Sequence, residues 1–120
     1  MFIALNHQQL NVYSSSRIFI IECYKFSKHL PPEEKFSMVA QIRRAALSVH
    51  LNIAEGSSRN SRVERKRYYE IARGSLIEID AAFDIAYELN YFSGYEKDIL
   101  GVSMKNCFSL LTGLINSHSK

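Results

Sequence analysis

Residues 32–56, PEEKFSMVAQIRRAALSVHLNIAEG, contain the pattern that decides the fold. Apolar side chains recur in this stretch at intervals of three and four residues, which places them on one face of an α-helix. Proline suits the first turn of a helix, and the two glutamates that follow it favour the positive end of the helix dipole. The stretch therefore predicts an amphipathic helix from Pro32 to about Gly56, whose buried stripe consists of Phe36, Val39, Ile42, Ala46, Val49 and Ile53.

A first helix is predicted upstream of this stretch, from about His7 or Gln8 to Lys28. The residue before Pro31 is disfavoured in helical conformation, so this helix closes near His29. Its predicted stripe consists of Leu10, Tyr13, the stem of Arg17, Phe19, Ile20, Cys23, Tyr24 and Ser27.

Two more helices are predicted downstream, after a break at residues 57–60. Ser61 and Glu64 have the spacing of a capping box, so a third helix begins at Arg62 and continues for about eight turns. Residues 93–96 supply a stop and a second capping box, formed by Ser93 and Glu96. The fourth helix follows, with an apolar stripe that consists of Ile99, Val102, Cys107, Leu110, Leu111, Leu114 and Ile115.

Four long helices with short connections predict an all-α fold, an antiparallel up-down-up-down four-helix bundle that forms one domain over residues 1–120. A chain of 120 residues with 47% hydrophobic and 22% charged residues has the size and composition of one globular domain. Cys23 and Cys107 lack metal-ligand spacing, so we expect buried free thiols in a reducing compartment. No signal peptide is predicted, and the longest apolar run, Ile18–Ile21, is too short to span a bilayer. We expect a cytoplasmic protein without a membrane partner.

The sequence contains no pattern for catalysis or cofactor binding. None of the four histidines follows a glutamate by three residues or another histidine by four, so neither a di-iron nor a zinc site is predicted. No glycine-rich nucleotide-binding motif or nucleophile elbow occurs. We therefore expect no metal, no cofactor and no enzymatic activity.

Positive charge is concentrated in the middle of the chain, although the net charge is only +3. Residues 43–73 hold eight Lys and Arg against three Asp and Glu, whereas residues 74–120 hold three against six. Clustered cations bind nucleic-acid phosphates without reading sequence. The candidate nucleic-acid-binding residues are Arg59, Arg62, Arg65, Lys66, Arg67 and Arg73.

Two tyrosines, Tyr68 and Tyr69, follow these cations and are candidates for stacking on bases. The alternative interpretation is that the cations are solvated, and pair with the acidic final part of the chain on a neighbouring helix or subunit. Both interpretations remain open on the sequence.

A second polar set occupies one stripe of each middle helix. Arg44, Ser48, Asn52 and Glu55 follow a 4-4-3 spacing, and Ser75 and Glu78 lie three residues apart. Because a buried carboxylate needs a partner, we expect a structural network between the two helices. Its candidate members are Arg44, Asn52, Glu55, Ser75 and Glu78. The alternative, an acid–base pair of the two glutamates, lacks an accompanying nucleophile or pocket.

Gly74 lies in the middle of the third predicted helix, where glycine costs about 1 kcal/mol against alanine. We expect the close approach of a neighbouring helix at this position. A hinge is the alternative.

Several blocks of the sequence resemble a known family over nearly the whole chain. The blocks are Gln41–Val49, Asn52–Gly56 with Arg59, Ile71–Glu78 and Ala86–Tyr91, supported by Leu10–Tyr13 and the turn Leu30–Glu34. They are similar to the four-helix bundle family that is also called the 23S rRNA intervening-sequence protein or S23 family, some members of which are encoded in insertions of bacterial 23S ribosomal RNA genes. The resemblance implies a small antiparallel bundle that assembles into a ring, with a homopentamer as the expected form.

The resemblance also suggests partners. Accessory variability determinant proteins of diversity-generating retroelements resemble this family, and use a basic ring surface to bind nucleic acid and a reverse transcriptase. RNA or DNA, and a partner protein such as a reverse transcriptase, are therefore implied as candidate partners. This chain departs from the family at Arg65-Lys66-Arg67, where members commonly place an aromatic or aliphatic residue, and the departure makes the region more basic. The competing hypothesis is a protein–protein interaction scaffold that binds no nucleic acid.

Overall fold

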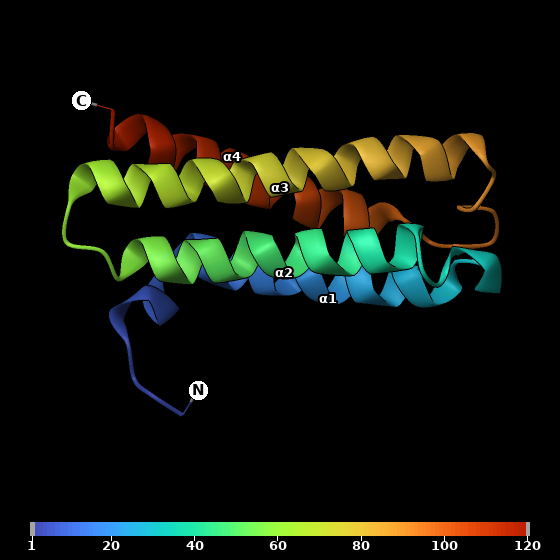
Figure 1. The fold of residues 1–120 in the computed structure, drawn as a ribbon, viewed down its shortest axis with the longest axis horizontal. Helices are drawn as coiled ribbons and strands as arrows, with labels where there is room; N and C mark the ends of the chain where they lie inside the picture. The colour runs from blue at the N-terminus through green and yellow to red at the C-terminus, as the bar shows by residue number, and fades with distance from the viewer. Residues whose placement is uncertain (1, 120) are drawn as a thin grey trace.

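The computed structural model describes residues 2–119, except for the side chains of Gln8 and Gln9. Within these residues the chain forms helices and no strand. The elements, in chain order, are η1 (Asn6–Gln9), α1 (Asn11–His29), η2 (Pro32–Glu34), α2 (Met38–Ser57), α3 (Arg62–Glu88) and α4 (Asp98–Ser117). Figure 1 shows the four α-helices running back and forth along the long axis of the molecule. The prediction of an all-α four-helix bundle is confirmed.

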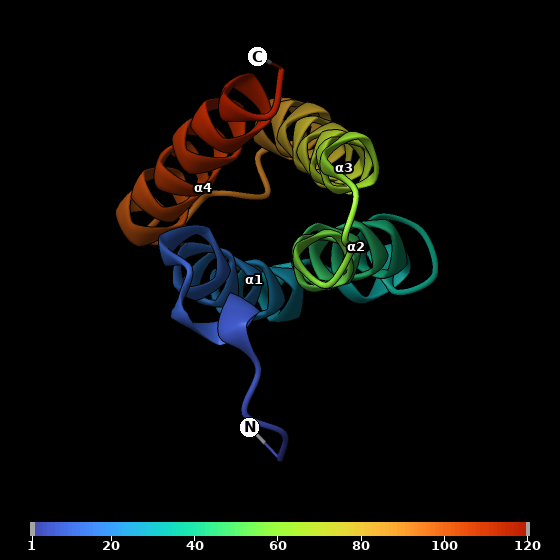
Figure 2. The ribbon, with the colours of Figure 1, turned by 90° about the vertical axis from the view of Figure 1, so that its left-hand side faces the viewer.

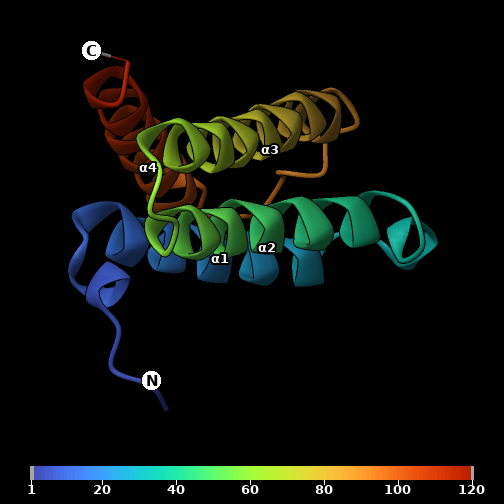
Figure 3. The same cartoon turned by 60° about the vertical axis from the view of Figure 1, so that its left-hand side comes forward.

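The four α-helices are arranged in a ring in cross-section (Figure 2). Each helix packs against the next one in the sequence, and α1 also packs against α4. The bundle measures 43 × 32 × 25 Å. Figure 3 shows α4 inclined to the other three helices.

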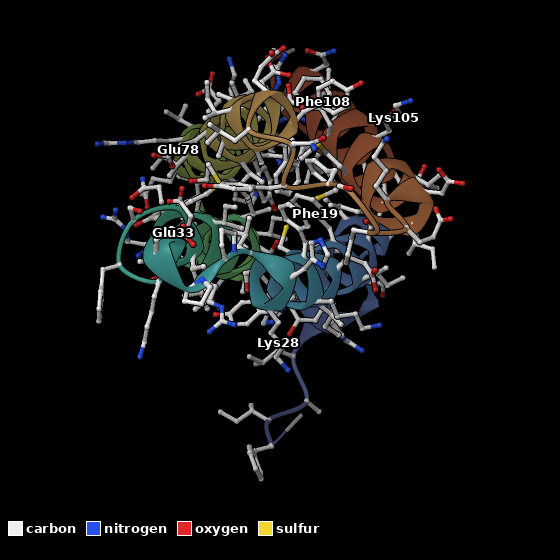
Figure 4. All side chains as sticks on the ribbon, turned by 90° about the vertical axis from the view of Figure 1, so that its right-hand side faces the viewer. Phe19, Lys28, Glu33, Glu78, Lys105 and Phe108 are labelled. Atoms are coloured by element: carbon white, nitrogen blue, oxygen red, sulfur yellow. The ribbon has the colours of Figure 1, made fainter. Side chains whose placement is uncertain are left out.

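The centre of the bundle is filled with apolar side chains from all four α-helices. Phe19 lies in the middle, whereas Lys28 and Glu33 lie at the perimeter (Figure 4). Burying a large apolar side chain contributes about 2 kcal/mol relative to leaving it exposed, so this core stabilises the bundle. The fully buried large side chains include Phe19, Phe26, Ile42, Ile53, Ile79 and Leu111.

α2 begins at Met38, six residues later than the sequence predicts. The prolines hold a tight turn in which the backbone N–H of Glu34 donates to the carbonyl of Pro31 at 2.9 Å. Ser37 then takes a non-helical conformation with φ −120° and ψ −89°, and its hydroxyl donates to the Glu34 carboxylate at 2.7 Å. As a consequence Phe36 is 88% exposed, and its predicted place in the buried stripe is wrong.

The first of the two predicted capping boxes forms its N-cap bond, and the second box does not form. The backbone N–H of Glu64 donates to Ser61 Oγ at 3.2 Å, so Ser61 caps α3 as predicted. α4 begins only at Asp98, and its N-cap residue contributes no side-chain hydrogen bond. The Glu96 carboxylate instead accepts from the backbone N–H of Asp98 at 3.0 Å.

The buried face of α4 differs from the predicted one. Ile99, Val102 and Leu110 are 60%, 59% and 38% exposed, and their predicted burial is wrong. Apolar residues surround most of this helix, so their spacing did not define a single face. Packing on α1 and α3 selects the face that contains Leu100, Ser103, Cys107, Leu111 and Ile115.

The connection between α3 and α4 folds back onto the core. Asn90 has a φ of 65°, and the next backbone N–H, of Tyr91, donates to the carbonyl of Ala86 at 2.8 Å. This arrangement ends α3 and satisfies one of its terminal carbonyls. Phe92 then stacks on Phe26 with ring centroids 4.3 Å apart, which anchors the connection.

Gly56, rather than Gly74, is the point where two helices approach closely. A Cβ atom at Gly56 would lie 2.7 Å from Tyr68 Cβ and 3.3 Å from the carbonyl oxygen of Arg65. A Cβ atom at Gly74 would meet nothing within 4 Å. The predicted close approach at Gly74 is wrong within this chain, because Gly74 lies on the exposed side of α3.

The two cysteines are buried free thiols, as predicted. Burial raises the pKa of Cys107 to about 12 and also raises the pKa of Cys23. The thiolate is the nucleophilic form of cysteine, so neither side chain is suited to nucleophilic chemistry.

One helix in the described part of the chain, α4, is long and apolar enough by composition to cross a membrane. One third of this stretch is buried, and the helix packs against α1 and α3. Core helices of bundles pass the same test of composition. This property of α4 was not predicted, because polar residues interrupt its apolar side chains and no long apolar run results.

Candidate nucleic-acid interface

Five of the six predicted cations, all except Arg73, gather at the end of the bundle where α2 turns into α3. The last turn of α4 lies at the same end (Figure 1). We call residues 59–67 the basic end. Each of its cations has a different environment, which decides how much of its charge faces outward.

Arg65 holds the turn between α2 and α3 together. Its guanidinium donates to the carbonyls of Arg59 and Asn60 at 3.1 and 2.8 Å. Its Nε also donates to Nε2 of His118, just after α4, at 3.2 Å. The side chain is half-buried, so its contribution is mainly structural.

Arg62 reaches the end of α4. Its guanidinium donates to the carbonyl of Ser117 at 3.2 Å. Carbonyls at a helix C-terminus carry partial negative charge, which favours a cation there. This contact and the one from Arg65 fix the last turn of α4 against the first turns of α3.

Arg59 covers the ring of Tyr68. Its guanidinium carbon lies 5.0 Å from the ring centroid, and the guanidinium donates to the tyrosine hydroxyl at 3.0 Å. It also pairs with Glu55, one turn earlier on α2, at 3.5 Å. The charge of Arg59 is thus partly balanced within the chain.

Tyr69 is only 2% exposed and cannot stack on a base. Its hydroxyl bonds to Ser57 at 2.9 Å, and its ring packs edge-on against His118 at 5.4 Å. Tyr68 is half-buried beneath Arg59. The predicted stacking role is therefore wrong for Tyr69, and the ring of Tyr68 already has a cationic cover.

Lys66 is half-buried and Arg67 is exposed. Neither forms an ion pair with any residue between positions 2 and 119, where the only pairs join Lys25 to Glu22 and Arg59 to Glu55. Pairing of these two cations with the acidic final part of the same chain is therefore not seen in the described residues.

Arg73 is separated from the basic end and lies on the seam between α3 and α4. Its guanidinium carbon lies 4.9 Å from the ring centroid of Phe108 on α4. The structure thus divides the six predicted cations: Arg59 and Arg65 support the turn, Arg62 binds the end of α4, Arg73 lies on the seam, and Lys66 and Arg67 have no ion-pair partner among residues 2–119.

The second predicted polar set separates into two clusters between α2 and α3. In one cluster, the hydroxyls of Ser48 and Ser75 lie 2.8 Å apart, and the Asn52 amide donates to Ser48 Oγ at 3.1 Å. In the other cluster, Arg44 donates to Gln41, whose amide donates to Glu78 at 2.8 Å.

Gln41 was missed by the sequence interpretation, although it precedes Arg44 by one helical turn on the same stripe. Glu55 belongs to neither cluster. It lies fourteen residues along α2 from Gln41, the residue that contacts Glu78, which corresponds to about 21 Å of helix. The two glutamates therefore do not form an acid–base pair. No group of three potential metal ligands was found in the described part of the chain.

Comparisons with known proteins agree with the fold. A family model described as 23S rRNA-intervening sequence protein matches residues 8–113. A crystal structure of a protein of unknown function from the S23 ribosomal protein family of Bacteroides thetaiotaomicron superposes with a TM-score of 0.77 and 24% identity, over 88% of this chain and 95% of that chain. No curated protein matches the chain. On the match over residues 8–113, the chain belongs to the 23S rRNA-intervening sequence protein family.

Proposed function

We propose that this chain is a non-enzymatic, oligomeric accessory protein of the cytoplasm that binds RNA or DNA through its basic end. The observation that carries the proposal is that half-buried Lys66 and exposed Arg67 have no acidic partner between residues 2 and 119. Such cations neutralise phosphates and release counterions. Because Tyr69 is buried and Tyr68 is covered by Arg59, the contacts are to the backbone rather than to bases. We expect little sequence preference.

The experiment is a gel-shift titration with duplex and single-stranded RNA and DNA over a series of salt concentrations. The test variant is Lys66→Glu with Arg67→Glu. The matched control is Lys28→Glu with Lys35→Glu, which makes the same change in charge at exposed positions of the opposite end of the bundle.

We expect the test variant to bind at least tenfold more weakly than the control, with a salt dependence reduced by roughly two phosphate contacts per engaged subunit. Thermal unfolding of both variants establishes that the fold is intact. The proposal is wrong if the unmodified protein binds no nucleic acid at low salt, or if both variants lose affinity equally.

Assembly into a ring, with a homopentamer as the family resemblance implies, is part of the proposal. Exposed aliphatic residues on the outer sides of α1 and α4 support it, because monomers rarely expose large apolar patches. They are Ile18, Ile21, Ile99, Val102 and Leu110. Residues 99–117 contain a single charged side chain, Lys105, so the outward face of α4 that carries Ile99, Val102 and Leu110 suits a contact between subunits. A ring presents the basic end several times and strengthens binding by avidity.

A protein–protein scaffold is the second candidate, with a partner such as a reverse transcriptase. The same exposed aliphatic residues favour it. It predicts that Lys66→Glu with Arg67→Glu changes the mass of the assembly or the capture of a partner protein, without any nucleic-acid affinity to lose.

A further inference from the structure

A groove runs along the seam between α3 and α4. Two adjoining hollows of about 350 and 300 Å³ form it, and both are lined by Asp80, Met104 and Lys105. From Leu76 to Tyr87 the groove follows α3 for about 16 Å. Figure 4 shows Phe108 and Lys105 on α4 beside α3. The groove is therefore longer than most small ligands and comparable to three turns of a helix.

The two walls of the groove carry opposite charges. Asp80 and Asp84 line the α3 wall, whereas Lys97, which precedes α4, and Lys105, on α4, line the other wall. All four side chains belong to exposed residues, and none forms an ion pair with any residue in the described range 2–119. The two signs balance, so the groove has no net attraction for the phosphates of a nucleic acid, which separates it from the basic end in function.

Polar atoms without a partner lie beside the Phe108 end of the groove. Arg73 packs its guanidinium on Phe108, and its Nε is buried without an acceptor from residues 2–119. Thr112, one turn along α4 from Phe108, has a buried hydroxyl that is likewise unpaired within this range. The Nε atom is enclosed by the chain itself, so a docked molecule reaches only the terminal nitrogens of this half-buried guanidinium, and a carboxylate is the acceptor that matches a guanidinium best.

We propose that this groove binds an amphipathic helix of a partner protein. The apolar stripe of that helix packs on Leu76, Met104 and Phe108, and one of its carboxylates accepts from Arg73. The helix carries cations on the flank that meets Asp80 and Asp84, and acidic residues on the flank that meets Lys97 and Lys105. This mode of binding is helix-in-groove recognition, and it requires no nucleic acid.

A second copy of this chain fits the groove less well through α1. Arg17 and Lys25 flank the exposed aliphatic residues Ile18 and Ile21 of α1, and the one carboxylate of this helix, on Glu22, is buried and pairs with Lys25 at 3.1 Å, so α1 offers no acceptor to Arg73. A partner with a carboxylate next to its apolar stripe is the complementary one. The two occupants are distinguished by the test below.

The test uses the full chain and two synthetic amphipathic helices of about 15 residues, with leucines at i, i+3, i+4 and i+7. One peptide carries glutamate in both end turns, so that either orientation brings a carboxylate to Arg73. The other peptide carries lysine at the same positions. Binding is measured by fluorescence anisotropy, and the bound surface is mapped by backbone amide shifts.

We expect the glutamate peptide to change the chemical shifts of backbone amides of α3 and α4 around the groove. We also expect it to bind at least tenfold more tightly than the lysine peptide. Arg73→Glu reverses this preference, since the repulsive and attractive pairs are exchanged. The control is Arg17→Glu, which alters an exposed arginine of α1 that lies 5.4 Å from the Tyr13 ring and lines neither hollow. The control leaves the preference for glutamate unchanged.

If Arg73→Glu fails to fold, Ile77→Lys replaces it, because Ile77 is 51% exposed and lines the groove. Ile77→Lys is expected to weaken both peptides at least tenfold. The proposal is overturned if neither peptide shifts groove amides, or if Arg73→Glu or its replacement binds as the control does. It is also overturned if dilution of the chain without peptide changes the chemical shifts of the groove amides. Such a change would show that a second copy of the chain covers the groove.

Discussion

Arg65 donates a hydrogen bond from Nε to Nε2 of His118 across 3.2 Å, and this contact ties the first turns of α3 to the end of α4. The other ring nitrogen of His118, Nδ1, lies 2.8 Å from the carbonyl oxygen of Leu114. Nδ1 therefore carries the proton and Nε2 accepts. One arginine thus joins the α2–α3 turn, α3 and the end of α4.

Arg65→Ala removes all of these contacts and leaves two carbonyls of the turn without their donor. We expect the free energy of unfolding to fall by about 2 kcal/mol, in the range for hydrogen bonds from charged groups. Urea denaturation measures this loss. Arg67→Ala is the control, because Arg67 is exposed, and it is expected to stay within about 0.5 kcal/mol of the unmodified protein. Equal losses in the two variants would contradict the role given to Arg65.

Gly56→Ala and Gly74→Ala should change stability in opposite directions. The new methyl group at Gly56 would meet Tyr68 Cβ at 2.7 Å, and neither helix backbone can move without disturbing the core. We expect a loss of about 1–3 kcal/mol. At Gly74 the methyl group meets nothing, so the better helix propensity of alanine should add about 1 kcal/mol. Thermal unfolding of both variants measures the two changes in stability. A Gly56→Ala variant more stable than the unmodified protein would contradict the prediction.

Stability should fall as the pH falls below about 6.5, the ordinary pKa of histidine. Burial lowers the pKa of His50, with smaller contributions from Arg17 and His7. The unfolded chain therefore binds a proton at a pH where folded His50 does not, so acid favours unfolding. The imidazole is held by Ser16, whose hydroxyl lies 2.7 Å from Nδ1.

The measurement for His50 is the urea midpoint between pH 7.5 and pH 5. His50→Gln should flatten this profile, because the variant has no group to titrate at that position. Carboxylates such as Glu34, whose pKa is lowered by hydrogen bonds from Ser37 and Tyr91, lose their contribution only at lower pH. An unchanged profile in His50→Gln would assign the acid sensitivity to another histidine.

Ile18→Glu with Val102→Glu should lower the mass of the assembly while each chain stays folded. The two residues are 54% and 59% exposed on α1 and α4, so the charges are tolerated by a monomer but are repelled from an apolar subunit contact. Native mass spectrometry measures the assembly, and circular dichroism monitors the fold. Phe36→Glu, at a residue 88% exposed beside the α1–α2 turn, is the control. An assembly of unchanged mass would place the subunit contact elsewhere.

The sequence was sufficient for the number and order of the helices, because a period of 3.6 residues and the paired prolines are local signals. It also identified the cap of α3, since Ser61 and Glu64 act within one turn. It failed at the start of α2, where a 3-10 turn at Pro32 precedes a non-helical Ser37. The two prolines and the two glutamates at positions 31–34 are equally compatible with the start of an α-helix and with this turn, so the sequence did not distinguish the two.

What the sequence by itself determined is the all-α architecture, the membership in a family and the concentration of cations between α2 and α3. Only the tertiary structure decided which cations face outward, because a guanidinium reaches several turns and binds whichever carbonyl or ring lies nearest. Arg65 and Arg73 look alike in the sequence, but one holds a turn and the other packs on Phe108. The buried face of α4 was decided in the same way, because a helix that is apolar on most sides has no preferred face until its neighbours pack against it.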